Sequence, residues 1–189
     1  MKNLFSFAAA LAMTLTASAQ NGPMFGVKAG LNLATMTNDS EARIKPGFYV
    51  AWSMECRINS WSGLEAALGY SLQGCKVKVE DTNLAINLNY INLPLVFKVY
   101  PVENLSICAG SQFGFLAASR VKMSSGQTTT SVDFGSECYA FDLSVPFGIA
   151  YKLNKNFEIG TRYVIGISYV LNAESTQNRV VQIGVGYIF

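Results

Sequence analysis

Eight ionisable residues occupy the polar positions of segments in which polar and apolar side chains alternate. They are Lys28, Glu55, Arg57, Glu65, Lys98, Asp142, Glu158 and Arg162. Two carboxyl groups brought together could act as a general acid and a general base. Because acidic and basic residues are equal in number here, the alternative is a set of salt bridges between the carboxylates and the four cations. We favour the salt bridges and expect no catalytic residue.

Other reactive groups are few. The chain contains no histidine, which excludes Ser-His triads, Cys-His pairs and histidine metal sites. Gly184 and Gly186 lie inside an alternating segment and indicate close packing, not nucleotide binding. The four cysteines have no metal-ligand spacing, so we expect no metal and no cofactor. Cys75 and Cys138 are the one candidate disulfide pair, although their segments should lie on different sides of the fold.

The composition indicates a protein that exposes apolar surface to something other than water. Half of the residues are apolar and 14% are charged, whereas about a quarter of residues are charged in an average soluble protein. The formal net charge is +2, so charge gives no reason to expect a nucleic-acid partner. At 189 residues, the chain is long enough for one domain.

The first 19 residues have the pattern of a cleavable signal peptide. Lys2 precedes an apolar stretch from Leu4 to Leu15, and Ala17-Ser18-Ala19 is a small-residue cleavage site. The alternative is an uncleaved anchor helix, but the stretch is shorter than the roughly 20 residues that span a bilayer. We therefore predict cleavage after Ala19 and a mature domain of residues 20–189. No later run is long and apolar enough for a membrane-spanning helix.

The rest of the chain alternates between apolar and polar residues, which is the periodicity of strands with two unlike faces. The predicted strands are 25–33, 48–58, 64–73, 84–99, 105–117, 139–151, 157–166 and 181–189. In the fourth, the apolar parity changes between Tyr90 and Leu93, which predicts a β-bulge there, next to Pro94. Leu116 falls among the polar positions of the fifth.

Connection lengths and aromatic residues indicate how these strands are arranged. Short turns at 59–62, 101–104 and 153–156 alternate with longer stretches near 36–45, 76–83, 118–137 and 169–178, which are predicted to be loops. Outer-membrane barrels have short periplasmic turns and long outer loops. Aromatic residues near the short turns and chain ends predict a lower aromatic girdle, composed of Phe25, Trp61, Phe97, Tyr100, Tyr151, Phe157, Tyr187 and Phe189.

The two faces differ in residue size, and this decides which face is inside. One carries bulky apolar side chains such as Phe141, Leu143 and Phe147. The other carries the eight charges together with glycine, alanine and serine, which suit a narrow lumen. In a soluble barrel of the lipocalin type, the charged face would be outside. We predict the membrane arrangement: an all-β, closed antiparallel up-and-down barrel of about eight strands, with a lumen too full for a diffusion pore.

Three segments resemble one family. Residues 25–32 (FGVKAGLN), 90–95 (YINLPL) and 184–189 (GVGYIF) are similar to the porin-family, PorT-like outer-membrane β-barrel domain, and this resemblance covers the whole mature chain. It implies a Gram-negative outer-membrane location and no particular reaction. The final strand, ending at Phe189, also resembles the signal that the outer-membrane insertion machinery recognises.

These observations predict a monomeric, non-enzymatic outer-membrane protein. Its lipid-facing surface contacts the bilayer, and its outer loops contact a surface ligand or an envelope protein. The alternative function is that of a PorT-like accessory of protein secretion or envelope assembly. The least favoured alternative is an enzyme that uses lumenal carboxylates.

Overall fold

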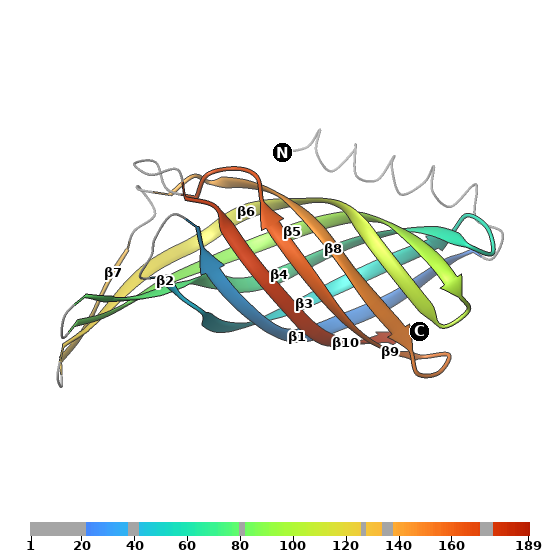
Figure 1. Cartoon of the computed structure of the whole chain (residues 1–189), viewed down its shortest axis with the longest axis horizontal. Coiled ribbons are helices and arrows are strands. Elements are labelled where there is room, and N and C mark those ends of the chain that lie inside the picture. Colours follow the sequence, from blue (N-terminus) through green and yellow to red (C-terminus); the bar gives the residue numbers. More distant parts are fainter. Residues whose placement is uncertain (1–21, 38–41, 80–81, 126–127, 134–137, 171–175) are drawn as a thin grey trace.

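A computed structural model describes residues 22–37, 42–79, 82–125, 128–133, 138–170 and 176–189 (Figure 1). The predicted signal peptide, residues 1–19, lies outside the described residues. No helix among the described residues is long and apolar enough to cross a membrane.

The described chain forms a closed antiparallel barrel. Its eight wall strands are β1 (Pro23–Met36), β3 (Lys45–Arg57), β4 (Ser62–Val79), β5 (Thr82–Val102), β6 (Leu105–Ser125), β8 (Phe141–Lys152), β9 (Phe157–Gly166) and β10 (Asn178–Ile188). Neighbours in sequence pair along the wall, and β1 pairs with β10 to close it (Figure 1). Two short strands, β2 (Ala42–Arg43) and β7 (Thr128–Asp133), pair with β4 and β6 respectively. The predicted fold class is confirmed.

The alternation of side chains places apolar groups outside and polar groups inside, as predicted. Phe141 and Phe147 are 44% and 45% exposed, whereas Glu55 is 6% exposed and faces the lumen. A β-strand sends successive side chains to opposite faces, so the period-two pattern of each strand divides its residues between the outer surface of the barrel and the lumen.

Two of the short turns are stabilised by asparagine side chains. The Asn59 Oδ1 atom accepts hydrogen bonds from the backbone N–H groups of Trp61 and Ser62, at 3.0 and 2.7 Å. Asn154 Oδ1 accepts from the N–H groups of Asn156 and Phe157, at 2.9 and 2.8 Å. Such Asx turns satisfy backbone donors within a tight connection. The predicted positions of these short turns are confirmed.

Strand lengths are unequal around the barrel. β4, β5 and β6 contain 18, 21 and 21 residues, whereas β8, β9 and β10 contain 12, 10 and 11. The predicted loops at 76–83 and 118–137 are therefore wrong for much of their length, because pairing continues to Val79 and Thr82 and from β6 to β7. We call the resulting extension the outer sheet; it comprises residues 42–43, 74–79, 82–87, 120–125 and 128–133. It projects beyond the ends of β1 and β10 (Figure 1).

The predicted bulge in the fourth strand is in the wrong place. The β4–β5 register keeps one offset on both sides of residues 90–93. The irregularity is on β6, where Asn89 pairs with Ala118 but Tyr90 pairs with Leu116, so that Ala117 is the additional residue. Pro94 lies buried within β5 and not beside this irregularity.

The parity change in β5 has a different cause. Leu88 and Tyr90 are 0% and 1% exposed and belong to an apolar cluster inside the outer end of the barrel. We call this cluster the outer plug; its buried members are Met36, Cys75, Leu88, Tyr90, Cys138 and Val170, and Val77, Ile86 and Leu116 pack against it. The apolar side chains at this end of β5 thus fill the lumen, with no change in strand geometry.

The outer plug also contains the two cysteines that we considered as a pair. We expected their segments to lie on different sides of the barrel. Both side chains nevertheless point into the lumen, where they are buried in the same cluster. The Cys75 Sγ atom lies 3.6 Å from the Met36 Sδ atom. Cys75 and Cys138 stay the one candidate pair for a disulfide.

Candidate functional site

The centre of the lumen-facing charge is Lys98 on β5, which is 1% exposed. Its Nζ atom lies 2.5 Å from Glu55 Oε2 on β3 and 2.5 Å from Glu65 Oε2 on β4. It also lies 4.0 Å from Glu158 Oε2 on β9. Because burial of a lone ammonium group costs several kcal/mol, these carboxylates are what make a lysine tolerable at this position.

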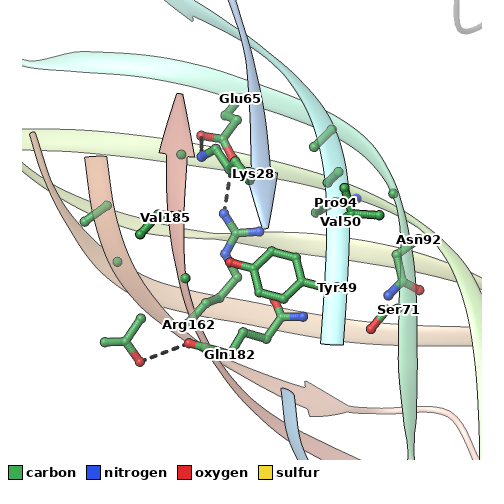
Figure 2. A pocket seen from close by; sticks show the side chains of 18 of the residues that line it. Lys28, Tyr49, Val50, Glu65, Ser71, Asn92, Pro94, Arg162, Gln182 and Val185 are labelled. Atoms are coloured by element: carbon green, nitrogen blue, oxygen red, sulfur yellow. Dashed lines mark hydrogen bonds and ion pairs between the residues drawn. The ribbon is translucent and has the colours of Figure 1, made fainter. Parts of the chain in front are cut away.

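Two further cations complete the central part of this network. Lys28 Nζ lies 2.7 Å from Glu65 Oε2 and 2.7 Å from Glu158 Oε1. Arg162 Nη2 lies 3.2 Å from Glu65 Oε1, and Figure 2 shows Lys28, Glu65 and Arg162 converging. Glu65 therefore contacts three cations from three other strands, and the predicted salt bridges between these residues are confirmed.

The end of the network nearest the short turns contains two residues that the sequence did not indicate. The Tyr100 hydroxyl donates to Glu55 Oε1 at 2.6 Å, and Lys152 Nζ lies 3.6 Å from that oxygen. Arg57 Nε is 3.9 Å from Glu55 Oε1, and the Arg57 guanidinium carbon lies 4.1 Å from the centre of the Tyr100 ring. Lys152 has the same parity in β8 as Asp142, which faces the lumen. This shared parity was the sequence signal that could have placed Lys152 in the network.

Tyr100 thus corrects one member of the predicted lower girdle. It is 5% exposed because it has the parity of Lys98 and points into the lumen. The other seven predicted members are between 38% and 63% exposed, which confirms that they face outward. Phe157 and Tyr187 are in contact, with ring centroids 5.1 Å apart.

Asp142 is a second correction, because its contacts are with hydroxyl groups and not with the cations of the network. Ser144 Oγ donates to Asp142 Oδ2, and Ser168 Oγ donates to Asp142 Oδ1 at 3.1 Å. The reason is their position along the barrel axis: Asp142 is the second residue of β8, at the end away from the short turns, whereas Lys98 and Arg57 lie near the short-turn ends of their strands.

A cavity of about 70 Å³, lined by both polar and apolar residues, lies next to the network. Its lining includes Lys28, Tyr49, Glu65, Arg162 and Gln182 (Figure 2). Since one water molecule needs roughly 10 to 15 Å³ measured in this way, the space suits a few waters and no large solute. Among the described residues, no three His, Cys, Asp or Glu side chains are grouped as metal ligands would be.

Glycines on the lumen side allow this filled arrangement. A Cβ atom added to Gly184 would lie 2.3 Å from the Tyr49 hydroxyl oxygen and 2.4 Å from the Ala29 carbonyl oxygen. The Tyr49 side chain, from the second strand along the wall, therefore occupies the space that a larger residue at Gly184 would need. This agrees with the tight lumen expected for about eight strands.

Replacing Tyr100 with phenylalanine tests the part of the network nearest the short turns. We expect the free energy of unfolding to fall by about 1.5 to 3 kcal/mol, because a hydrogen bond to a charged and buried acceptor is lost while the ring is kept. The measurement is urea unfolding of the protein folded into lipid vesicles. The matched control is Tyr151→Phe, at an exposed girdle position on β8, which should change stability by less than about 0.5 kcal/mol.

The family follows from comparison with known proteins. A family model described as an outer membrane protein beta-barrel domain matches residues 5–189. The chain belongs to this family. This outer-membrane barrel is an integral protein of the outer membrane, with its apolar belt in the lipid bilayer. No curated protein sequence matches it.

Solved structures share the fold of this outer-membrane barrel. Neisserial surface protein A is 20% identical, with a TM-score of 0.56 over 89% of this chain and 99% of the neisserial one. Ail, the attachment invasion locus protein of Yersinia pestis, is 16% identical, with a TM-score of 0.53 over 88% of this chain and 98% of Ail. A second structure of Ail contains the heparin analogue sucrose octasulfate, with the same identity and TM-score over 88% and 99%.

Proposed function

We propose that this outer-membrane barrel is a non-enzymatic, non-conducting surface protein that presents the outer sheet to a ligand or partner outside the cell. The observation that carries the proposal is the unequal length of the strands. The extra residues of β4, β5 and β6 form a sheet beyond the barrel wall, together with β2 and β7.

The lumen supports the non-conducting and non-enzymatic parts of the proposal. The outer plug fills the lumen above this cavity, and the network around Lys98 fills it below. Glu55, Glu65 and Glu158 each contact at least two cations. Carboxylates held in this way are already engaged, and the cavity beside them is too small for a large substrate.

Surface contact is a role that has a parallel in the same fold. The structure of Ail with sucrose octasulfate contains a soluble ligand bound to a barrel of this architecture. In the present chain, the corresponding contact surface would be the outer sheet and the loops around it. The exposed residues of that sheet would then determine which ligand binds.

Two measurements on the full mature protein test the proposal. Protease added to intact cells should cleave within the outer sheet and leave the barrel core protected, and planar-bilayer recording should show no steady conductance. Cleavage only after the outer membrane is permeabilised would place the sheet on the periplasmic side. A large steady conductance would contradict the filled lumen. Either result would refute the proposal.

The N-terminal segment and the last strand support a proposal about export and assembly. We propose that the protein is secreted by its signal peptide, so N-terminal sequencing of the mature form should begin at Gln20. The final strand ends in Phe189, which is 63% exposed on the lipid-facing side. We propose that the insertion machinery recognises this terminal aromatic residue and that the protein is a monomer once assembled.

A second candidate function, a PorT-like accessory of secretion or envelope assembly, has one observation in its favour. Within the described part of the chain, β7 pairs with β6 on one edge, and residues 128–133 offer their other edge to a partner strand. Open strand edges are common sites for addition of another chain. Cross-linking in intact cells from a cysteine introduced at Thr130 should then yield a discrete protein adduct, whereas a lone monomer would favour the first proposal.

A further inference from the structure

Four basic side chains lie together on the outer sheet. Arg43 on β2, Lys76 on β4, and Arg120 and Lys122 on β6 are all exposed. Arg43 is directly opposite Lys76, Lys76 is opposite Ala85, and Ala85 is opposite Lys122. Adjacent strands are about 4.8 Å apart, so the four side chains start from a small area. We call these four residues the basic patch.

The basic patch is on the side of the sheet that continues down into the lipid-facing wall. On β4, Cys75 is buried in the lumen and Lys76 points the other way, the direction also taken by Leu72. On β6, Val121 is buried and Lys122 is exposed. Lys76 follows Leu72 by four residues, which at 3.3 Å per residue and a tilt near 45° is about 9 Å nearer the cell exterior.

The charges of the basic patch are not balanced by the salt bridges described above. None of the salt bridges of the described residues includes Arg43, Lys76, Arg120 or Lys122. Asp133 is opposite Arg120 in the register of β6 and β7. Like charges directly opposite each other on neighbouring strands, such as Arg43 and Lys76, destabilise a sheet. An external anion would remove that cost.

The basic patch is confined to one side of the barrel. At the outer ends of the strands on the other side, the exposed side chains include Tyr139, Ile167 and Tyr169. Among the described residues of that rim, the exposed basic residue is Arg179. The charge is thus not a general feature of the outer rim. The basic patch lies beside the apolar belt and not at the tip of the sheet. Its side chains therefore face the lipid molecules that surround the barrel.

We propose that the basic patch binds the phosphate groups of a glycolipid in the outer leaflet. The apolar column of Tyr70, Leu72 and Phe115 would contact the acyl chains, while Lys76, Arg120 and Lys122 contact the phosphates above them. Basic residues placed next to anionic headgroups attract them through charge, and each contributes to the affinity. This inference rests on the outward placement of the outer sheet in the proposed function.

The test uses the full mature protein folded in detergent micelles and fluorescent lipid A with two phosphate groups. Lys76→Glu/Lys122→Glu should weaken binding at least about tenfold, because two attractions become repulsions. Two control variants reverse a charge elsewhere: Arg179→Glu on the opposite rim and Lys155→Glu in a periplasmic turn. Each should stay within about twofold of the unmodified protein. Heat-modifiability on a detergent gel checks that every variant folds.

The source of the phosphate is tested with three other probes. Lipid A without phosphate groups should bind the unmodified protein no better than it binds the double variant. Inorganic phosphate and sucrose octasulfate should compete poorly, because they lack the acyl chains. Equal affinity for dephosphorylated lipid A, no loss in the double variant, or displacement of lipid by equimolar sucrose octasulfate would each overturn the inference. Intact-cell proteolysis and conductance test the proposed function separately, so the two failures are distinguishable.

Discussion

Replacing Lys98 with methionine should destabilise the folded barrel by about 3 to 5 kcal/mol. The substitution keeps much of the volume but removes the cation that lies 2.5 Å from both Glu55 and Glu65. Breaking a buried salt bridge from one side is strongly destabilising, since the remaining carboxylates keep their desolvation cost without their partner. Urea unfolding from lipid vesicles would measure this as a lower midpoint with an unchanged slope.

Two further variants separate lost charge pairing from lost packing. Lys155→Met removes a lysine from an exposed turn and should change stability by less than about 0.5 kcal/mol. Lys98→Met combined with Glu65→Gln should be less destabilised than the sum of the single variants, because contacting residues do not add independently. A loss below about 1 kcal/mol for Lys98→Met would mean that water screens the network, against the burial described here.

An arginine at Val145 should destabilise the barrel by about 2 to 4 kcal/mol. Val145 is in the outward-facing row of β8, midway between Tyr139 and Tyr151. A charged side chain on the lipid face is most costly at the bilayer midplane and much less costly at the interfaces. The measurement is again the free energy of unfolding from lipid vesicles.

The same strand supplies the matched control. Tyr139→Arg introduces the identical side chain at the outer end of this row, where Tyr139 is 47% exposed, and should cost no more than about 1 kcal/mol. Equal effects at the two positions would mean that Val145 is not in the hydrocarbon layer. That result would contradict the assigned orientation of the barrel.

The barrel could be predicted from sequence because lipid imposes one rule on every wall strand. Leu31, Trp52 and Leu68 belong to alternating rows, and all three are more than half exposed in the structure. The short turns were equally predictable, because Asn59 and Asn154 provide local turn chemistry. The alternation and the asparagine turns depend only on residues close together in the sequence, so both can be recognised without knowledge of the fold.

The outer end was harder to predict because two environments there look alike in sequence. Leu88 and Leu116 are apolar, as lipid-facing residues are, but they fill the lumen as part of the outer plug or against it. We interpreted the resulting parity change in β5 as a bulge, whereas the additional residue is Ala117 on β6. Alternation alone does not distinguish an apolar side chain that faces lipid from one that packs in the outer plug.

The candidate site was predictable in kind but not in membership. Alternation placed Lys98, Glu65 and Arg162 inside, and opposite charges have to meet there. Which charges meet depends on height and strand tilt, which depend on the register around the whole barrel. For this reason Asp142 was assigned to the network and Lys152 was missed, although both face the lumen.

The pairing of β1 with β10 has a consequence for how the protein folds. Residues such as Gly30 and Gly184, far apart along the chain, are direct partners in this seam. Contacts between distant segments slow folding, since the intervening chain must be ordered before they form. We expect the seam to close last, and a nascent chain that stops before β10 would expose two unpaired strand edges, which is a state prone to aggregation.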